Sequence, residues 1–318
     1  MRIFLAGATG VVGRRAVPLL AGAGHEVTAL GRSPEKLRQL ERMGARPVTV
    51  DLFAAEAVRN AAAGHDAVVN LATHIPPGMR ALLPWAWREN DRLRRIASAN
   101  LCEAALAAGA RRFIQESFAP VYPDRGEQWI EESTPLQPVG FNRSILDAER
   151  VAERFATGGG VGITLRFGAF YGPDAVHMLD LIRLVRRGWA PMPGRAASFI
   201  SSVSHDDAAG AVVAALGARR SGVHNVVDDE PLTHRDYVDS LAAALDVPPP
   251  RLPPAWMTPI FGSVGRLLAR SLRIDNRKLR GESNWLPRLP SARDGWPEIA
   301  NELRPALSAH RQSPVSNP

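Results

Sequence analysis

Met1-Arg-Ile-Phe-Leu-Ala-Gly7-Ala-Thr-Gly10-Val-Val-Gly13 opens the chain and carries its strongest structural signal. A short apolar run leads into three glycines spaced three residues apart, and an apolar-periodic stretch then begins. This pattern predicts a buried strand, a tight turn and the first turn of a helix. The sequence therefore predicts a dinucleotide site, in which free N–H groups at the helix start hold the phosphates. The residues expected to form it are Gly7, Thr9, Gly10, Val11, Val12 and Gly13.

The residue that follows the second predicted strand, 27–31, bears on the type of cofactor. Arg32 stands at the place where an acidic residue would bind the ribose 2′-hydroxyl of NAD. A guanidinium matches a phosphate with two parallel hydrogen bonds, whereas a carboxylate would repel it. The sequence therefore favours NADP(H) over NAD(H), the alternative being that Arg32 is a solvated surface charge. Other residues expected beside the cofactor lie at strand ends, namely Asp51, Leu52, Leu71, Ala72 and Phe167.

Composition restricts the class of protein. The chain has 318 residues and a net charge of +7 from 39 basic and 32 acidic residues, without a basic block, so no nucleic-acid partner is expected. Cys102 is the only cysteine, which excludes an internal disulfide and fits a reducing compartment. No secretory signal is visible, and the apolar stretch 256–272 is interrupted by Arg266 and Arg270. We therefore expect a soluble, cytoplasmic protein without a membrane partner.

Strand and helix patterns alternate over the first half of the chain. This alternation predicts an α/β fold, a Rossmann-type doubly wound parallel sheet covered by helices on both faces. The expected dinucleotide-binding domain spans 1–170, and 200–228 return to it. The segments 171–199 and 229–307 are Pro-rich and helical, and they predict a smaller, mainly helical C-terminal substrate lobe. The polar residues 308–318 predict a disordered tail.

Several segments together resemble one family. The glycine loop 7–13, the strand and serine-bearing loop 112–122, the segment 165–173, and the later segments 203–209 and 224–227 match its elements in order. On these segments the chain resembles the NAD(P)-dependent epimerase/dehydratase branch of the short-chain dehydrogenase/reductase superfamily. The resemblance implies an NAD(P) cofactor, a small-molecule substrate and a possible homodimer formed through two helices of the nucleotide lobe.

The catalytic pair of that family is missing here. Its chemistry rests on a Tyr-x-x-x-Lys in which lysine lowers the pKa of a proton-donating tyrosine one helical turn away. Phe141 stands at the tyrosine position and Ile145 at the lysine position. No lysine lies between Lys36 and Lys278, so another alignment does not restore the pair. The chain is thus an atypical member by resemblance.

Four residues are candidates for replacing the missing proton donor, namely Ser117, Tyr122, Tyr171 and His74. Ser117 leaves its strand at the carboxyl end, where ligands bind in this architecture, and a loop-capping role is the alternative. The two tyrosines are also readily explained as structural loop residues. His74 follows the fourth strand, where it would reach the nicotinamide end of the cofactor, and an ordinary polar loop histidine is the alternative. Glu116 leaves the same strand as Ser117, and the alternative that it points away from the site stays open.

The substitutions also predict the character of the substrate pocket. Phe118, Phe141 and Ile145 would make its reacting end apolar, and His177 follows into the substrate lobe. Core packing is the alternative for the other apolar candidates, namely Trp85, Trp87, Trp256, Met178 and Phe199. This pocket favours an apolar or aromatic substrate over a nucleotide sugar, whose hydroxyls and diphosphate need polar partners. The histidines do not cluster with carboxylates at ligand spacing, so no metal site is expected.

Three functions remain compatible with the sequence. The leading one is an NADP(H)-dependent oxidoreductase that acts on a carbonyl or activated alkene of a small apolar or aromatic molecule. The alternatives are a non-redox isomerase, lyase or cyclase, and a non-catalytic regulator that senses NADP(H). Turnover distinguishes them, because a sensor binds the cofactor without consuming it.

Overall fold

A seven-stranded parallel sheet forms the centre of the molecule. The computed structural model describes residues 1–309, and in them the strand order is β11-β7-β5-β4-β1-β2-β3. Neighbouring strands all run parallel. The strands are β1 (Arg2–Ala6), β2 (Glu26–Leu30), β3 (Arg46–Val48), β4 (Ala67–Asn70), β5 (Arg112–Phe118), β7 (Val161–Phe167) and β11 (Gly222–Val226). The order changes direction between β1 and β4, which places a ligand crevice at their carboxyl ends.

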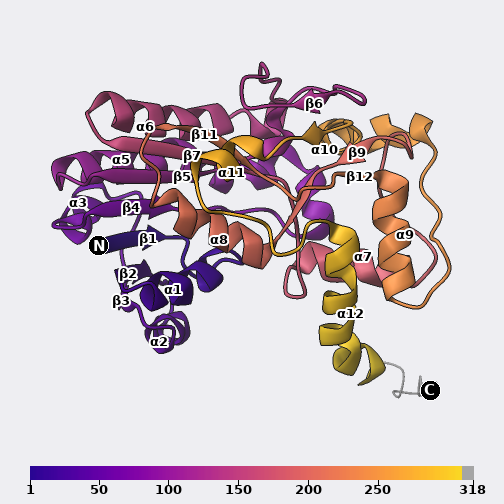
Figure 1. The fold of residues 1–318 in the computed structure, drawn as a ribbon, viewed down its shortest axis with the longest axis horizontal. Coiled ribbons are helices and arrows are strands. Elements are labelled where there is room, and N and C mark those ends of the chain that lie inside the picture. The colour runs from indigo at the N-terminus through magenta and orange to yellow at the C-terminus, as the bar shows by residue number, and fades with distance from the viewer. Residues whose placement is uncertain (310–318) are drawn as a thin grey trace.

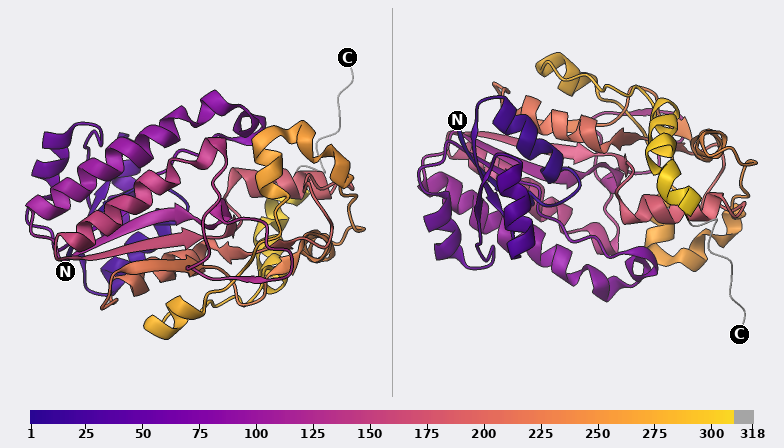
Figure 2. Two further views of the ribbon diagram at one scale, coloured as in Figure 1. Left: turned by 90° about the horizontal axis from the view of Figure 1, so that it is seen from above. Right: turned by 90° about the horizontal axis from the view of Figure 1, so that it is seen from below.

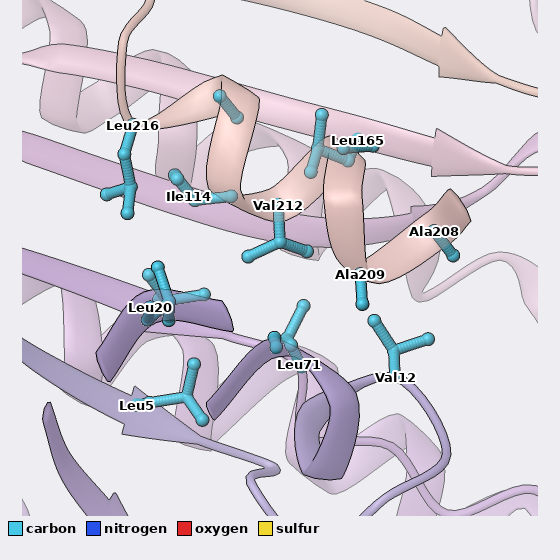
Figure 3. Packing of buried hydrophobic residues seen from close by; sticks show 14 of the residues in the cluster. Leu5, Val12, Leu20, Leu71, Ile114, Leu165, Ala208, Ala209, Val212 and Leu216 are labelled. Atoms are coloured by element: carbon cyan, nitrogen blue, oxygen red, sulfur yellow. The ribbon is translucent and has the colours of Figure 1, made fainter. Parts of the chain in front are cut away.

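Helices cover both faces of this sheet (Figures 1 and 2). Because successive side chains of a strand point to opposite faces, Ile3 and Leu5 pack on one side and Phe4 on the other. The first face carries α1 (Gly13–Gly22), α2 (Pro34–Arg42) and α8 (His205–Ala215), and the second carries α3 (Ala55–Ala62), α5 (Ser98–Ala107) and α6 (Ile145–Thr157). Figure 3 shows Leu20 and Val212 from two helices of the first face meeting over the sheet.

Segments of the second half of the chain that lie outside the sheet domain form a smaller lobe beside the carboxyl ends of the strands (Figure 1). Its core contains Tyr171, Met178, Tyr237 and Trp296, and the rings of Tyr237 and Trp296 lie 5.1 Å apart. Its helices are α7 (Val176–Val185), α9 (His234–Ala244), α10 (Gly262–Leu268) and α12 (Ala292–Ala309), whereas α11 (Arg277–Glu282) packs beside β11, with Leu279 in the core of the first face of the sheet. Short strand pairs join the lobe to the sheet domain, namely β8 (Ala169–Tyr171) with β10 (Ser202–Ser204), β9 (Phe199–Ile200) with β12 (Leu232–Thr233), and β6 (Trp129–Ile130) with β13 (Arg273–Ile274).

The structure confirms the predicted Rossmann-type fold with its mainly helical C-terminal lobe. The segment that was expected to return to the sheet contains β11, which pairs with β7. Residues 308 and 309 belong to α12, and the rest of the predicted tail, 310–318, lies outside the described residues. Of the helices in residues 1–309, none is both long enough and apolar enough to cross a membrane.

Candidate functional site: a nucleotide loop opening into an apolar cavity

The glycine loop between β1 and α1 leaves no room for a side chain at Gly7 or at Gly13. Gly7 has φ +79°, and a Cβ there would lie 2.3 Å from the carbonyl carbon of Leu71. A Cβ on Gly13 would lie 2.2 Å from the carbonyl oxygen of Gly7. Among the described residues, the backbone N–H groups of Val11, Val12 and Gly13 have no acceptor. These N–H groups at the start of α1 fit the phosphates of a dinucleotide.

The residues expected beside the adenosine half line the neighbouring strand ends. Arg32 follows β2, is exposed and makes no ion pair within the described residues, so its charge is available to a phosphate. Asp51 is exposed after β3 and accepts a hydrogen bond from the Phe53 backbone N–H at 3.0 Å. Leu71 is buried at the end of β4, and the Ala72 N–H donates to Asn70 Oδ1 at 3.1 Å. These positions fit the predicted cofactor site, and the individual roles stay predictions.

A cavity of about 670 Å³ begins at Val11 in the glycine loop and extends between the sheet and the C-terminal lobe. Its wall is largely apolar and aromatic, as is typical of sites that bind small molecules. Aromatic and methionine side chains from both domains line it, namely Trp87, Phe118, Phe141, Phe170, Met178, Met192 and Phe199. The rings of Trp87 and Phe141 lie 4.4 Å apart.

A few polar side chains also line the cavity. Arg94 and Glu116 come from the sheet domain, Asn142 from the turn before α6, and His234 from α9. Burial raises the pKa of Glu116, although the charge of Arg94 acts in the other direction. Burial disfavours the charged form of His234 as well, so it lowers the pKa of this histidine to about 4, and the ring is neutral near pH 7.

Ser117 and Tyr122 are not among the residues that line the cavity. Ser117 Oγ donates to Glu149 at 2.6 Å, and Glu149 forms two hydrogen bonds with Arg166, at 2.8 and 2.7 Å. Arg166 in turn donates to the Tyr122 hydroxyl at 2.7 Å, and this hydroxyl donates to Asn225 at 2.8 Å. Burial raises the pKa of Tyr122 to about 12. The two candidates therefore belong to a buried hydrogen-bond network.

Of the other four candidates, only His177 lines the cavity. Tyr171 is fully buried in the core of the lobe, and its hydroxyl reaches the Ser291 carbonyl at 3.5 Å. His74 is exposed, and its backbone N–H donates to Asn90 Oδ1 at 2.9 Å. Ile145 is fully buried in α6, so it packs in the core, whereas His177 lies at the cavity wall.

Aromatic candidates also divide between the wall, the core and the surface. Trp87, Met178 and Phe199 line the cavity together with Phe118 and Phe141. Phe167 is buried, with its ring 5.3 Å from that of Phe170. By contrast, Trp85 and Trp256 are 59% and 73% exposed.

A charged cluster lies between the glycine loop and the cavity mouth. Asp174 forms ion pairs with Arg14 and Arg15 of α1 and accepts a hydrogen bond from His205 at 2.9 Å. Although burial opposes it, bonding to His205 and Arg15 holds the pKa of Asp174 well below its usual range. The cluster ties the lobe to the first turn of α1, where the phosphates would bind.

Sequence reasoning missed Arg94, Asn142 and His234. Arg94 lies in a run of arginines that looks like a solvated helix face. Yet Arg94, Ala97, Ser98 and Leu101 repeat at helical spacing and are all buried, so the detectable signal was a charge on an apolar stripe. No comparable sequence signal distinguishes Asn142 or His234. Of the described residues, no three histidine, cysteine, aspartate or glutamate side chains are grouped to hold a metal ion.

Comparison with known proteins places this fold and site in a family. Residues 7–161 match a family model described as NAD(P)H-binding. Over 305 residues the chain is 33% identical to a 3-diazoavenalumate denitrifying reductase of a Streptomyces species, with 93% of this chain and 99% of the relative covered. The chain belongs to the NAD(P)H-binding short-chain dehydrogenase/reductases of the epimerase/dehydratase type. The resemblance drawn from the sequence is thereby confirmed.

Solved structures of this family share the fold. The human epimerase family protein SDR39U1 with NADPH superposes with a TM-score of 0.74 at 21% identity, covering 95% of this chain and 100% of that chain. DesIV, a dTDP-glucose 4,6-dehydratase from Streptomyces venezuelae with NAD bound, superposes with a TM-score of 0.78 at 23% identity, covering 97% and 98%. Because one neighbour holds NADPH and the other NAD, the fold alone does not determine the cofactor preference.

Proposed function

We propose that this protein is an NADPH-dependent reductase that transfers hydride to a small apolar or aromatic molecule. The observation that carries the proposal is the apolar cavity that continues directly from Val11 of the glycine loop. When bound, NADPH supplies the hydride. The loop N–H groups bind its pyrophosphate, and Arg32 binds its 2′-phosphate.

The cavity supports an apolar acceptor. Phe118 and Phe141 replace polar side chains at the reacting end and exclude water from it. A nucleotide sugar would leave many of its hydroxyl groups unpaired against this wall, and unpaired buried hydroxyls are costly. The acceptor is therefore a carbonyl, an activated alkene or another electron-poor group on a small apolar or aromatic molecule.

The 33% identity with a denitrifying reductase of a 3-diazo compound favours one further acceptor, an aryl diazonium group. Hydride addition forms an aryl C–H bond, the C–N bond breaks, and its electron pair leaves with dinitrogen. NADPH is oxidised to NADP⁺, and no proton is consumed. Such an acceptor suits a site in which Tyr122 is held in a buried network and Phe141 occupies the family's tyrosine position.

Calorimetry with NADPH, NADP⁺, NADH and NAD⁺ tests the cofactor part of the proposal. We expect at least tenfold tighter binding of the phosphorylated forms. NADPH oxidation is then followed with aromatic ketones, enones and aryl diazonium salts, with dinitrogen release measured for the last class. Binding without oxidation across all three classes would favour the NADP(H)-sensing regulator, and failure to bind any cofactor would favour the non-redox isomerase or lyase.

A further inference from the structure

Two nitrogen donors in the cavity wall lack an acceptor. Arg94 is 3% exposed and Asn142 is 1% exposed, and both line the cavity. Within the described residues, Arg94 Nε and Asn142 Nδ2 have no hydrogen-bond partner. A buried donor without an acceptor is unfavourable, and a charged one more so. A ligand that supplies the acceptor atoms would remove this cost.

The segments that carry these two donors pack against each other. Trp87, at the start of α4 (Arg88–Arg92), places its ring 4.4 Å from that of Phe141, which directly precedes Asn142. Arg94 follows α4 in the π-helical turn η3 (Leu93–Ala97), a local geometry that is frequent at functional sites. Both donors therefore lie on segments of the wall that pack against each other.

The charge of Arg94 is not neutralised by direct contact with a carboxylate. Among the described residues it forms no ion pair, and Glu116, Asp91 and Glu149 act on it only over longer distances. Glu149 is already paired with Arg166. Burial raises the pKa of Glu116, which favours its neutral form, a hydrogen-bond donor. The wall around Arg94 thus carries a buried positive charge and further donors among apolar side chains, and Arg270 and Asp174 also line the cavity.

We propose that Arg94 and Asn142 bind the carboxylate of an aromatic acid whose ring lies against Phe118 and Phe141. A carboxylate carries a single charge and accepts in the plane of a guanidinium, so it matches one buried arginine. The inference rests on the proposed reductase function and names its substrate class. Arg94 and Asn142 hold one end of the substrate, and the apolar wall orients its ring.

Calorimetry with matched acid and amide probes tests this site. The pairs are benzoate and benzamide, trans-cinnamate and cinnamamide, and 2-naphthoate and 2-naphthamide, each titrated with and without NADP⁺. We expect at least one acid to bind at least tenfold more tightly than its amide. Arg94→Met removes this preference, and Asn142→Ala weakens acid binding severalfold while amide binding is unchanged. Arg143→Met is the matched control, because Arg143 is exposed and does not line the cavity.

Several outcomes overturn the proposal. These are equal affinity for acids and amides, no binding of any acid at millimolar concentration, and an acid preference that survives Arg94→Met. Loss of NADPH binding in Arg94→Met with its fold intact would assign the arginine to the cofactor instead. If that variant does not fold, Asn142→Ala provides the test. An acid preference without NADPH oxidation would refute the reductase function and leave the carboxylate site standing.

Discussion

Replacing Gly13 by alanine tests the shape of the nucleotide loop. The new Cβ would lie 2.2 Å from the Gly7 carbonyl oxygen and 2.7 Å from Ala8 Cα, both backbone atoms that no rotamer change can move away. Ordinary contacts begin at 3.4 Å, so α1 and the loop must separate by about 1.2 Å, the difference between these distances. Overpacking of this kind costs about 1–3 kcal/mol of stability.

The same displacement weakens cofactor binding. The N–H groups of Val11, Val12 and Gly13 move with the loop, and a shift near 1 Å carries a hydrogen bond beyond its effective range. A hydrogen bond to a charged group contributes about 1.5–3 kcal/mol, and each 1.4 kcal/mol corresponds to about tenfold in affinity. We therefore expect Gly13→Ala to weaken NADPH binding by about 10- to 100-fold, measured by calorimetry on protein whose fold is verified by circular dichroism.

Gly22→Ala in the same helix is the control. A Cβ there meets no atom within 4 Å, so this variant should gain up to about 1 kcal/mol of stability and bind NADPH like the wild type. Thermal unfolding compares the two variants. Wild-type NADPH affinity in a folded Gly13→Ala protein would refute the assignment of the loop as the phosphate cradle.

Three further predictions concern charge. Arg32→Ala should weaken NADPH binding about tenfold or more and change NADH binding less than twofold, because the 2′-phosphate loses a charge-assisted hydrogen bond. Equal losses of affinity for the two cofactors, measured by calorimetry, would contradict the assignment of Arg32 to the 2′-phosphate. Glu149→Gln should lower the free energy of unfolding, measured with urea, by about 3–5 kcal/mol, because it leaves the buried Arg166 charge unpaired. Glu298→Gln, which breaks an exposed ion pair, should lower it by less than about 1 kcal/mol, and similar losses for both variants would contradict the burial argument. Burial lowers the pKa of His234 to about 4, so the unfolded chain, titrating near 6.5, binds more protons between these values. Stability from this group is present above about pH 7 and decreases as the pH falls from about 6.5 to 4, by up to about 3 kcal/mol. His234→Gln should flatten that decrease, and an unchanged pH profile of unfolding would contradict it.

The fold and nucleotide loop were predictable because their signals are local. Gly7 and Gly13 mark a turn between an apolar strand and an apolar-periodic helix. Gly13 is required by atoms of Gly7 and Ala8 in the same turn, whereas the space at Gly7 is also limited by Leu71, which is distant in sequence. The alternation of Ile3, Phe4 and Leu5 between the two faces of the sheet also follows from a short run of sequence. Such patterns need no knowledge of distant contacts.

The cavity was less predictable because its geometry depends on which side of β5 faces it. Ser117 and Glu116 are neighbours in one strand, so their side chains point to opposite faces. The structure places Glu116 at the cavity and Ser117 against Glu149, a residue 32 positions away in sequence. Arg94 was overlooked for a similar reason: the sequence shows an apolar stripe at helical spacing around it, but only the tertiary packing shows that this stripe is buried.

The most direct test of the reductase account uses NADPH deuterated at its reactive carbon. The purified protein is incubated with this cofactor and aromatic acids that carry a ketone, enone or diazonium group, and the product is analysed by mass spectrometry. The account predicts oxidation of NADPH and one deuterium in the product for at least one acceptor. Bound NADPH that stays reduced with every acceptor, or a product without deuterium, would contradict it.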